Sequence, residues 1–237
     1  SDLFGNLLSA ETDDDLQELA KEIMPMMSEH ENNISLNEEL FARIKAVYEQ
    51  QDKETLSPEQ HKLLEDIYNG FVRNGANLLG EDKEKYRALC KELSLLTLQF
   101  SENNLKETND YKLVITDKSQ LAGLPESAVE AAAETAGEKG VEGWVFTLQA
   151  PSYGPFLTYA DSRDLRRELY MAYNTKCTHD NASNNLEIVK KLANVRMEIA
   201  QLLGYDNFAE YNLQERMAQN SESVYKLLDQ LLEAYTP

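Results

Sequence analysis

An uninterrupted apolar periodicity between Glu81 and Asn109 does most to constrain how this 237-residue chain can fold. Neither glycine nor proline interrupts it, and its apolar side chains recur near the period of an α-helix. They are Tyr86, Leu89, Leu93, Leu96, Phe100 and Leu105. At 1.5 Å per residue this pattern predicts one helix of ~40 Å, long enough to serve as the spine of a domain.

The region before this spine is also predicted to be helical. No glycine occurs between Gly5 and Gly70, so other residues must form its turns. An amphipathic pattern over residues 16–27 contains Pro25, which predicts a kink or an early break in that helix. We expect the next helix to begin after Ser35, with Glu38 completing a capping box.

A third start signal lies at Ser57, Pro58 and Gln60, which predict an N-cap, a first-turn proline and a capping-box partner. From Ser162 onward the pattern is again helical, in four segments ending near Tyr235. Among these segments, a helix over residues 192–203 stops at Gly204, and a second amphipathic helix continues through Phe208, Tyr211, Leu213 and Met217.

A short β-rich insertion separates the two helical regions. Residues 111–116 are rich in β-formers, and Trp144, Phe146 and Leu148 alternate with less apolar neighbours, as in a strand. We expect a helix from Pro125 to about Gly137, a loop at residues 151–155 and a further short strand at residues 156–159. The predicted fold is therefore mainly α, a multi-helical lobe with a small inserted β-sheet at about residues 111–160.

Composition excludes several classes of partner. The net charge is −19, whereas nucleic acid binding needs clustered lysine and arginine. The same charge disfavours docking on anionic membranes, and no apolar stretch is long enough to span a bilayer. The two cysteines, Cys90 and Cys177, form no CxxC pair, and Cys90 lies among apolar helix positions as a core residue would. We expect a reducing, cytoplasmic location, with a periplasmic or exported parent protein as the open alternative.

Histidines offer no metal site. His30 and Glu31 begin an HExxH-like string, but Ile34 occupies the position of the second histidine. Because the motif needs two histidines one turn apart, His30 is predicted to be a solvated residue near a helix end. His61 is predicted to lie on a helix surface, and His179 in a polar loop or cap.

Other catalytic signatures are also missing: there is no GxSxG, P-loop or GxGxxG string. The basic cluster Arg163, Arg166 and Arg167 alternates with acids and predicts helical salt pairs on a wet face. Tyr153 and Gly154 lie in the expected loop, where either a rigid turn or a binding surface is possible and the turn is favoured. We assign no catalytic, metal or substrate-binding residue.

Several sequence blocks, taken together and in order, resemble the thimet-oligopeptidase and peptidyl-dipeptidase family of zinc metallopeptidases, and bacterial peptidyl-dipeptidases in particular. They cover nearly the whole chain: FGNLLSA at 4–10, LFARIKAVY at 40–48, FVRNGA at 71–76, LAGL at 121–124, the stretch 159–173 with RDLRRE, the stretch 192–218, and 224–228.

The resemblance implies that residues 1–237 are most of the N-terminal helical lobe of a longer peptidase, forming one wall of a substrate channel that admits short peptides. In that family the zinc is bound by two histidines of HExxH and a later glutamate, none of which has a counterpart here. We therefore expect zinc and the catalytic lobe in the intact polypeptide, hydrolysis of short peptides with release of C-terminal dipeptides, and no zinc or activity in this chain alone.

A different class of function fits the acidic helices equally well: a free-standing helical interaction or scaffold domain without catalysis. The coding sequence beyond Pro237 distinguishes the two, since continuation into HExxH supports the peptidase.

Overall fold

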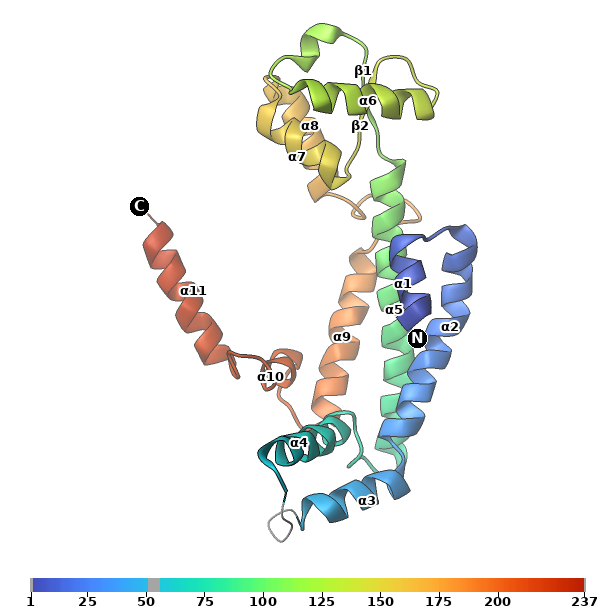
Figure 1. Ribbon diagram of the computed structural model, residues 1–237, viewed down its shortest axis with the longest axis vertical. Helices are drawn as coiled ribbons and strands as arrows, with labels where there is room; N and C mark the ends of the chain where they lie inside the picture. Colours follow the sequence, from blue (N-terminus) through green and yellow to red (C-terminus); the bar gives the residue numbers. More distant parts are fainter. Residues whose placement is uncertain (1, 51–55, 237) are drawn as a thin grey trace. The chain divides into compact units, whose positions relative to one another are not determined.

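The computed structural model describes residues 2–50 and 56–236, which are mostly helical (Figure 1). The elements in chain order are α1 (Asp2–Ala10), α2 (Asp14–Ser35), α3 (Glu38–Tyr48), α4 (Pro58–Arg73), α5 (Gly80–Asp110), β1 (Leu113–Ile115), η2 (Lys118–Leu121), α6 (Glu126–Glu138), β2 (Trp144–Phe146), α7 (Ala150–Tyr159), α8 (Arg163–Asn174), α9 (Leu186–Leu202), α10 (Phe208–Leu213) and α11 (Ser221–Tyr235). The predicted class, mainly helical with a small sheet, is confirmed.

The chain forms two compact units. The first comprises the residues up to 98 together with those from 190 onward, and the second comprises residues 99–189. Helices α5 and α9 each contribute residues to both units. The predicted spine corresponds to α5, a single helix of 31 residues.

Local sequence signals set most helix starts in the first unit. Ser57 and Gln60 form the predicted capping box of α4, with Pro58 in its first turn. The predicted cap at Ser35 is wrong: α2 continues through Ser35, and the Asn37 side chain accepts the Leu40 N–H instead. Both residue types can cap, and the chain uses the one that directly precedes α3.

Helix α2 does not break at Pro25 but continues to Ser35. The proline removes one main-chain hydrogen bond, and the turns on either side keep theirs. At the other end of the unit, α9 ends at Leu202, and Gly204 follows with a φ of +86°. The predicted stop of this helix at Gly204 is confirmed. The following helix is shorter than predicted: α10 ends at Leu213, and Met217 lies beyond it, fully exposed.

The core of the first unit contains an aromatic cluster between α3 and α4. The rings of Tyr48 and Tyr68 stack with centroids 3.9 Å apart, and Phe41 stacks on Tyr68 and Phe71 at 5.8 and 6.1 Å. Stacked aromatic pairs of this kind add to the stabilisation that their burial already gives. Phe41 is the most enclosed of the four, with 7% of its surface exposed.

The second unit is built around an antiparallel pair of strands, in which Leu113 pairs with Phe146 and Ile115 with Trp144. Helix α6 packs against β2, and α7 packs against both α6 and α8 (Figure 1). The core consists of nine buried residues from the strands, these helices, η2 and the adjoining loops: Leu113, Ile115, Leu121, Ala132, Phe146, Leu148, Phe156, Ala160 and Leu169.

The strand predicted at residues 156–159 is wrong, since α7 spans Ala150–Tyr159. Phe156 is completely buried, and its ring meets that of Phe146 edge-on at 4.6 Å. Pro151 lies in the first turn of α7, where a proline costs no hydrogen bond, whereas Pro155 lies inside the helix and removes one. Tertiary packing of Phe156 outweighs this cost and the loop signal of Gly154.

Candidate functional site

The three histidines occupy separate elements. His30 is exposed in α2, His61 is partly buried in the first turn of α4, and His179 lies in the loop after α8. Among residues 2–50 and 56–236, no group of three or more histidine, cysteine or acidic side chains could hold a metal ion. Within the same residues, no helix is both long and apolar enough to cross a membrane.

Neither cysteine is activated as a nucleophile. Burial raises the pKa of the Cys90 thiol above its ordinary value. Burial likewise raises the pKa of Cys177, and the nearby Glu107 carboxylate adds to the effect. Reactive cysteines need the opposite shift, because the thiolate is the nucleophile. The backbone N–H of Cys177 donates to Glu107 at 2.6 Å, so this residue joins the loop to α5.

Tyr153 and Arg166 make structural contacts. Tyr153 lies on α7 rather than in a loop, and its ring stacks on Tyr173 at 4.3 Å. Arg166 donates to the main-chain carbonyls of Ala160, the C-cap of α7, and of Asp161, the residue after it. It therefore caps a neighbouring helix instead of forming the helical salt pair predicted for it.

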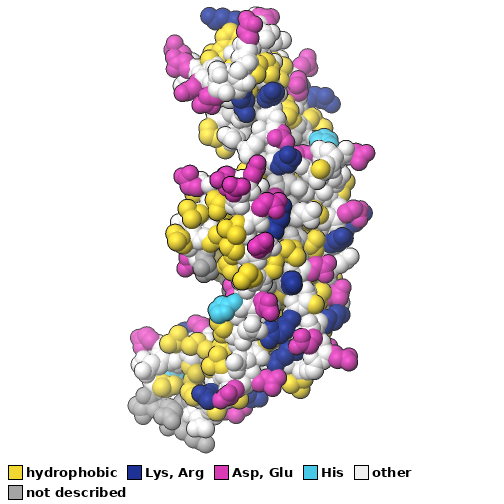
Figure 2. All heavy atoms as spheres, turned by 90° about the vertical axis from the view of Figure 1, so that its right-hand side faces the viewer, with side chains coloured by type: hydrophobic (Ala, Val, Ile, Leu, Met, Phe, Trp, Pro, Cys, Tyr) yellow, Lys and Arg dark blue, Asp and Glu magenta, His cyan; other side chains and the backbone are white. Residues whose placement is uncertain are grey.

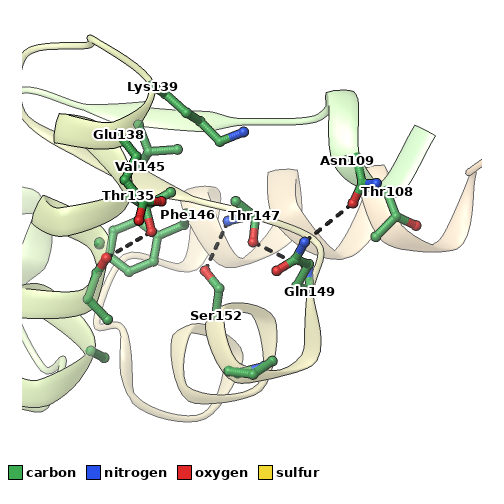
Figure 3. Close-up of a pocket in the computed structure, with 14 residues that line it drawn as sticks. Thr108, Asn109, Thr135, Glu138, Lys139, Val145, Phe146, Thr147, Gln149 and Ser152 are labelled. Atoms are coloured by element: carbon green, nitrogen blue, oxygen red, sulfur yellow. Dashed lines mark hydrogen bonds between the residues drawn. The ribbon is translucent and has the colours of Figure 1, made fainter. Parts of the chain in front are cut away.

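A cavity of about 490 Å³ in the second unit is a candidate site (Figure 3). Three segments line it: the end of α5, one face of α6, and β2 with the following residues up to Ser152. Thr108 and Asn109 lie at one side, while Glu138 and Lys139 lie at the other. Helix α6 presents only small side chains at this part of the lining: Ala128, Ala131, Ala132 and Thr135.

Hydrogen bonds hold the polar groups of this cavity in place (Figure 3). The Thr147 backbone N–H donates to Ser152 Oγ at 2.9 Å, joining β2 to the start of α7. The Gln149 amide donates to Asn109 Oδ1 at 3.3 Å, joining that segment to α5. The donors and acceptors that face the cavity are therefore anchored on three different elements.

The lining offers groups suited to binding. Of the described residues that line the cavity, none is a histidine, cysteine or aspartate. A serine nucleophile needs an adjacent base, whereas Ser152 Oγ accepts a hydrogen bond from a main-chain N–H. Hydroxyl and amide groups beside small apolar surfaces are suited to hydrogen bonding with another polypeptide.

Nothing in the sequence marked this cavity. Its lining comes from residues 108–109, 128–139 and 145–152, and serine, threonine and alanine occur throughout the chain. The sequence signals for β2 and for α6 were both present, but no local pattern indicated that α5 would join them.

Comparison with known proteins relates the chain to peptidases. The profile of Peptidase family M3 matches residues 156–237. Oligopeptidase A of Haemophilus influenzae is 33% identical over 236 residues, which are 98% of this chain and 35% of that protein. Dipeptidyl carboxypeptidase of Escherichia coli is 33% identical over 233 residues, 98% of this chain and 34% of that protein. Thimet-like oligopeptidase of Dictyostelium discoideum is 25% identical, with 98% and 33% covered.

The resemblance drawn from the sequence blocks is thus confirmed. The chain spans about a third of the length of the curated relatives it matches. Oligopeptidase A and dipeptidyl carboxypeptidase match it at the same identity, so the two subgroups are not separated by similarity alone.

Proposed function

We propose that this chain is the N-terminal helical lobe of an M3 zinc metallopeptidase that hydrolyses short peptides and releases C-terminal dipeptides. The observation that carries the proposal is the similarity along 98% of the chain to proteins named oligopeptidase A and dipeptidyl carboxypeptidase. The lobe supplies binding surface, and the catalytic lobe of the same polypeptide supplies the chemistry. Short peptides are the substrates, and the cytoplasm is the proposed location.

Zinc does not fit the residues of this chain. The HExxH-like string at His30 has Ile34 in place of its second histidine, and the described residues contain no other group of three ligands. A catalytic zinc needs three protein ligands and an open position for water. We therefore assign the metal, and the general base beside it, to the part of the enzyme outside this sequence.

The cavity between α5, α6 and β2 is the surface that we propose contacts peptide. Its neutral hydroxyl and amide groups can pair with main-chain N–H and C=O groups of an extended segment. A volume of about 490 Å³ suits only a few residues of such a segment. In the proposed enzyme this surface forms part of a channel wall.

Peptide titration of the isolated chain tests the binding role. Short unstructured peptides are added to ¹⁵N-labelled protein, and we expect amide shifts at Thr135, Thr147 and Ser152. Ala131→Trp should abolish them, because the indole would occupy the cavity from the exposed face of α6. Ala133→Trp is the matched control, since Ala133 is exposed on the same helix but does not line the cavity. Equal shifts in both variants would place peptide binding elsewhere.

Metal analysis and a hydrolysis assay test the assignment of chemistry. The purified chain should retain no stoichiometric zinc and should cleave none of these peptides. Cleavage by protein of verified purity would contradict the proposal. Reading the coding sequence past Pro237 tests the parent enzyme: we expect an HExxH string and a later glutamate ligand. A stop codon soon after Pro237 would favour the scaffold alternative or a degenerate peptidase.

A further inference from the structure

Half of the six methionines lie within residues 24–27, directly before the HExxH-like string. The structure places this segment and the string on one continuous helix, α2. The zinc interpretation of His30 fails because Ile34 lies one turn after it. One turn before it, however, lie Met26 and Met27, whose thioether sulfurs are also metal ligands.

Helix geometry brings these three side chains to one face. At 3.6 residues per turn, His30 lies about 40° from Met26 and about 60° from Met27 around the helix axis. The pairs are separated by four and three residues, the spacings at which helical side chains meet. All three line one cavity of about 490 Å³, together with Ile23 and Glu31.

Two of the three side chains are exposed, and Met27 is half-buried. Met26 has 67% of its surface exposed, although an apolar side chain of this size usually packs inside, and His30 is exposed as well. Methionine is unbranched and flexible, so its sulfur can move to meet an ion held by the neighbouring imidazole.

The choice of ion follows from the ligand set. Thioethers are soft and select Cu(I), and imidazole is also a copper ligand, whereas magnesium and calcium require oxygen ligands. A chain with a net charge of −19 also concentrates cations around it. We propose that Met26, Met27 and His30 form a binding site for Cu(I), with Ag(I) as its redox-inert substitute.

Nuclear magnetic resonance of the full chain labelled with [¹³C-methyl]methionine tests the site one residue at a time. Silver nitrate is titrated in chloride-free buffer beyond the two equivalents that Cys90 and Cys177 would bind. We expect the ε-methyl signals of Met26 and Met27 and the His30 ring signals to shift. The chemical shift of the Met24 ε-methyl signal should not change, because Met24 lies about 160° from Met26 around the same helix.

Variants make the result quantitative. Met26→Leu, Met27→Leu and His30→Ala should each weaken Cu(I) binding by about tenfold or more in an anaerobic chelator competition, since even the loss of a group supporting a ligand costs tenfold or more. Met24→Leu, the matched control, should leave affinity unchanged. The proposal is overturned by methyl signals that stay in place while the cysteines bind silver, by equal losses in the control, or by equal shifts with Zn(II).

Discussion

At the scale of single residues, the Arg73 side chain joins two segments of the first unit that lie far apart in sequence. Its guanidinium lies 2.9 Å from the Glu215 carboxylate and donates to Gln214 Oε1 and to the Tyr211 carbonyl, each at 2.8 Å. It also lies over the Tyr211 ring, 4.4 Å from the centroid. Only a planar fork of donors can make these contacts together, so lysine is no substitute.

Replacing Arg73 with lysine should therefore loosen the segment 205–216. We expect a loss of about 2 kcal/mol in the local opening free energy, the range for hydrogen bonds to a charged group. Hydrogen exchange of the amides in residues 205–216 measures it. Arg216→Lys is the control, because the Arg216 side chain is exposed. Unchanged protection in the Arg73 variant would show that the fork contributes little.

Lys83 and Glu38 form an ion pair that depends on pH. Their charged atoms are 2.7 Å apart, and Lys83 is 8% exposed although Glu38 is open to solvent. The hydrogen bond from Lys83, with its positive charge, lowers the pKa of Glu38. A carboxyl group whose pKa is lower in the folded than in the unfolded state stabilises the fold at any pH above its unfolded-state pKa. This stabilisation is lost as the pH falls through its folded-state pKa.

Glu38→Gln should accordingly destabilise the protein at neutral pH, and the difference from the original chain should shrink toward pH 3, as the Glu38 carboxylate takes up a proton and loses its charge. Urea denaturation midpoints at the two pH values measure the change. Glu39→Gln is a control in the same helical turn, since Glu39 pairs with Arg43 while both are exposed. A pH-independent deficit would mean that packing, not charge, is what Glu38 supplies.

At the scale of elements, Gly123 fixes how the turn after η2 meets the end of α7. Its φ is +86°, and an added Cβ would lie 2.2 Å from the Tyr159 carbonyl oxygen. The adjacent Ala122 carbonyl accepts the Asp161 N–H at 2.8 Å. The two segments are thus held at a distance that no larger residue permits.

We expect Gly123→Ala to cost more than about 2 kcal/mol, because the left-handed backbone alone costs roughly 1–2 kcal/mol in an alanine and the clash adds to it. Gly140→Ala separates the two effects, since Gly140 has a φ of +63° but no atom within 4 Å of the added Cβ. Thermal unfolding of both variants should show the larger loss at Gly123. Equal losses would show that the backbone at Ala122 and Tyr159 yields to the clash.

Elements could be predicted from sequence where their signals were local. The α4 capping box and the glycine end of α9 are contained within a few residues each, and both are confirmed. Helix α7 could not be recognised, because burial of Phe156 against Phe146 decides it, and these side chains meet only in the folded unit. Arg73 and Tyr211, which are in contact, lie 138 residues apart in sequence, so no local pattern could predict their contact.

At the scale of the whole molecule, the sequence predicted the helical class and the family resemblance but not the candidate site. The cavity draws its lining from three segments that carry no motif, and its polar groups are common residue types. The family profile could not supply it either, because it matches residues 156–237, whereas the lining of the cavity comes from residues 108–152. Tertiary packing of α5, α6 and β2 alone creates it.

Charge is the remaining property of the whole chain, with 42 acidic and 23 basic residues. Over the face drawn in Figure 2, acidic side chains are spread widely and basic ones are interspersed among them. An excess of like charge acts as self-repulsion, which destabilises a compact state.

Salt should consequently stabilise this protein. Raising sodium chloride from about 10 mM to about 200 mM shortens the Debye length from roughly 30 Å to less than 10 Å, which screens most repulsion between exposed carboxylates. We expect the melting temperature to rise by a few degrees, because the net repulsion that is removed exceeds the weak exposed ion pairs that are also screened. Calorimetry over this range measures the effect. A melting temperature that falls with salt would mean that the pairs, including Lys83 with Glu38, outweigh the surplus of 19 negative charges.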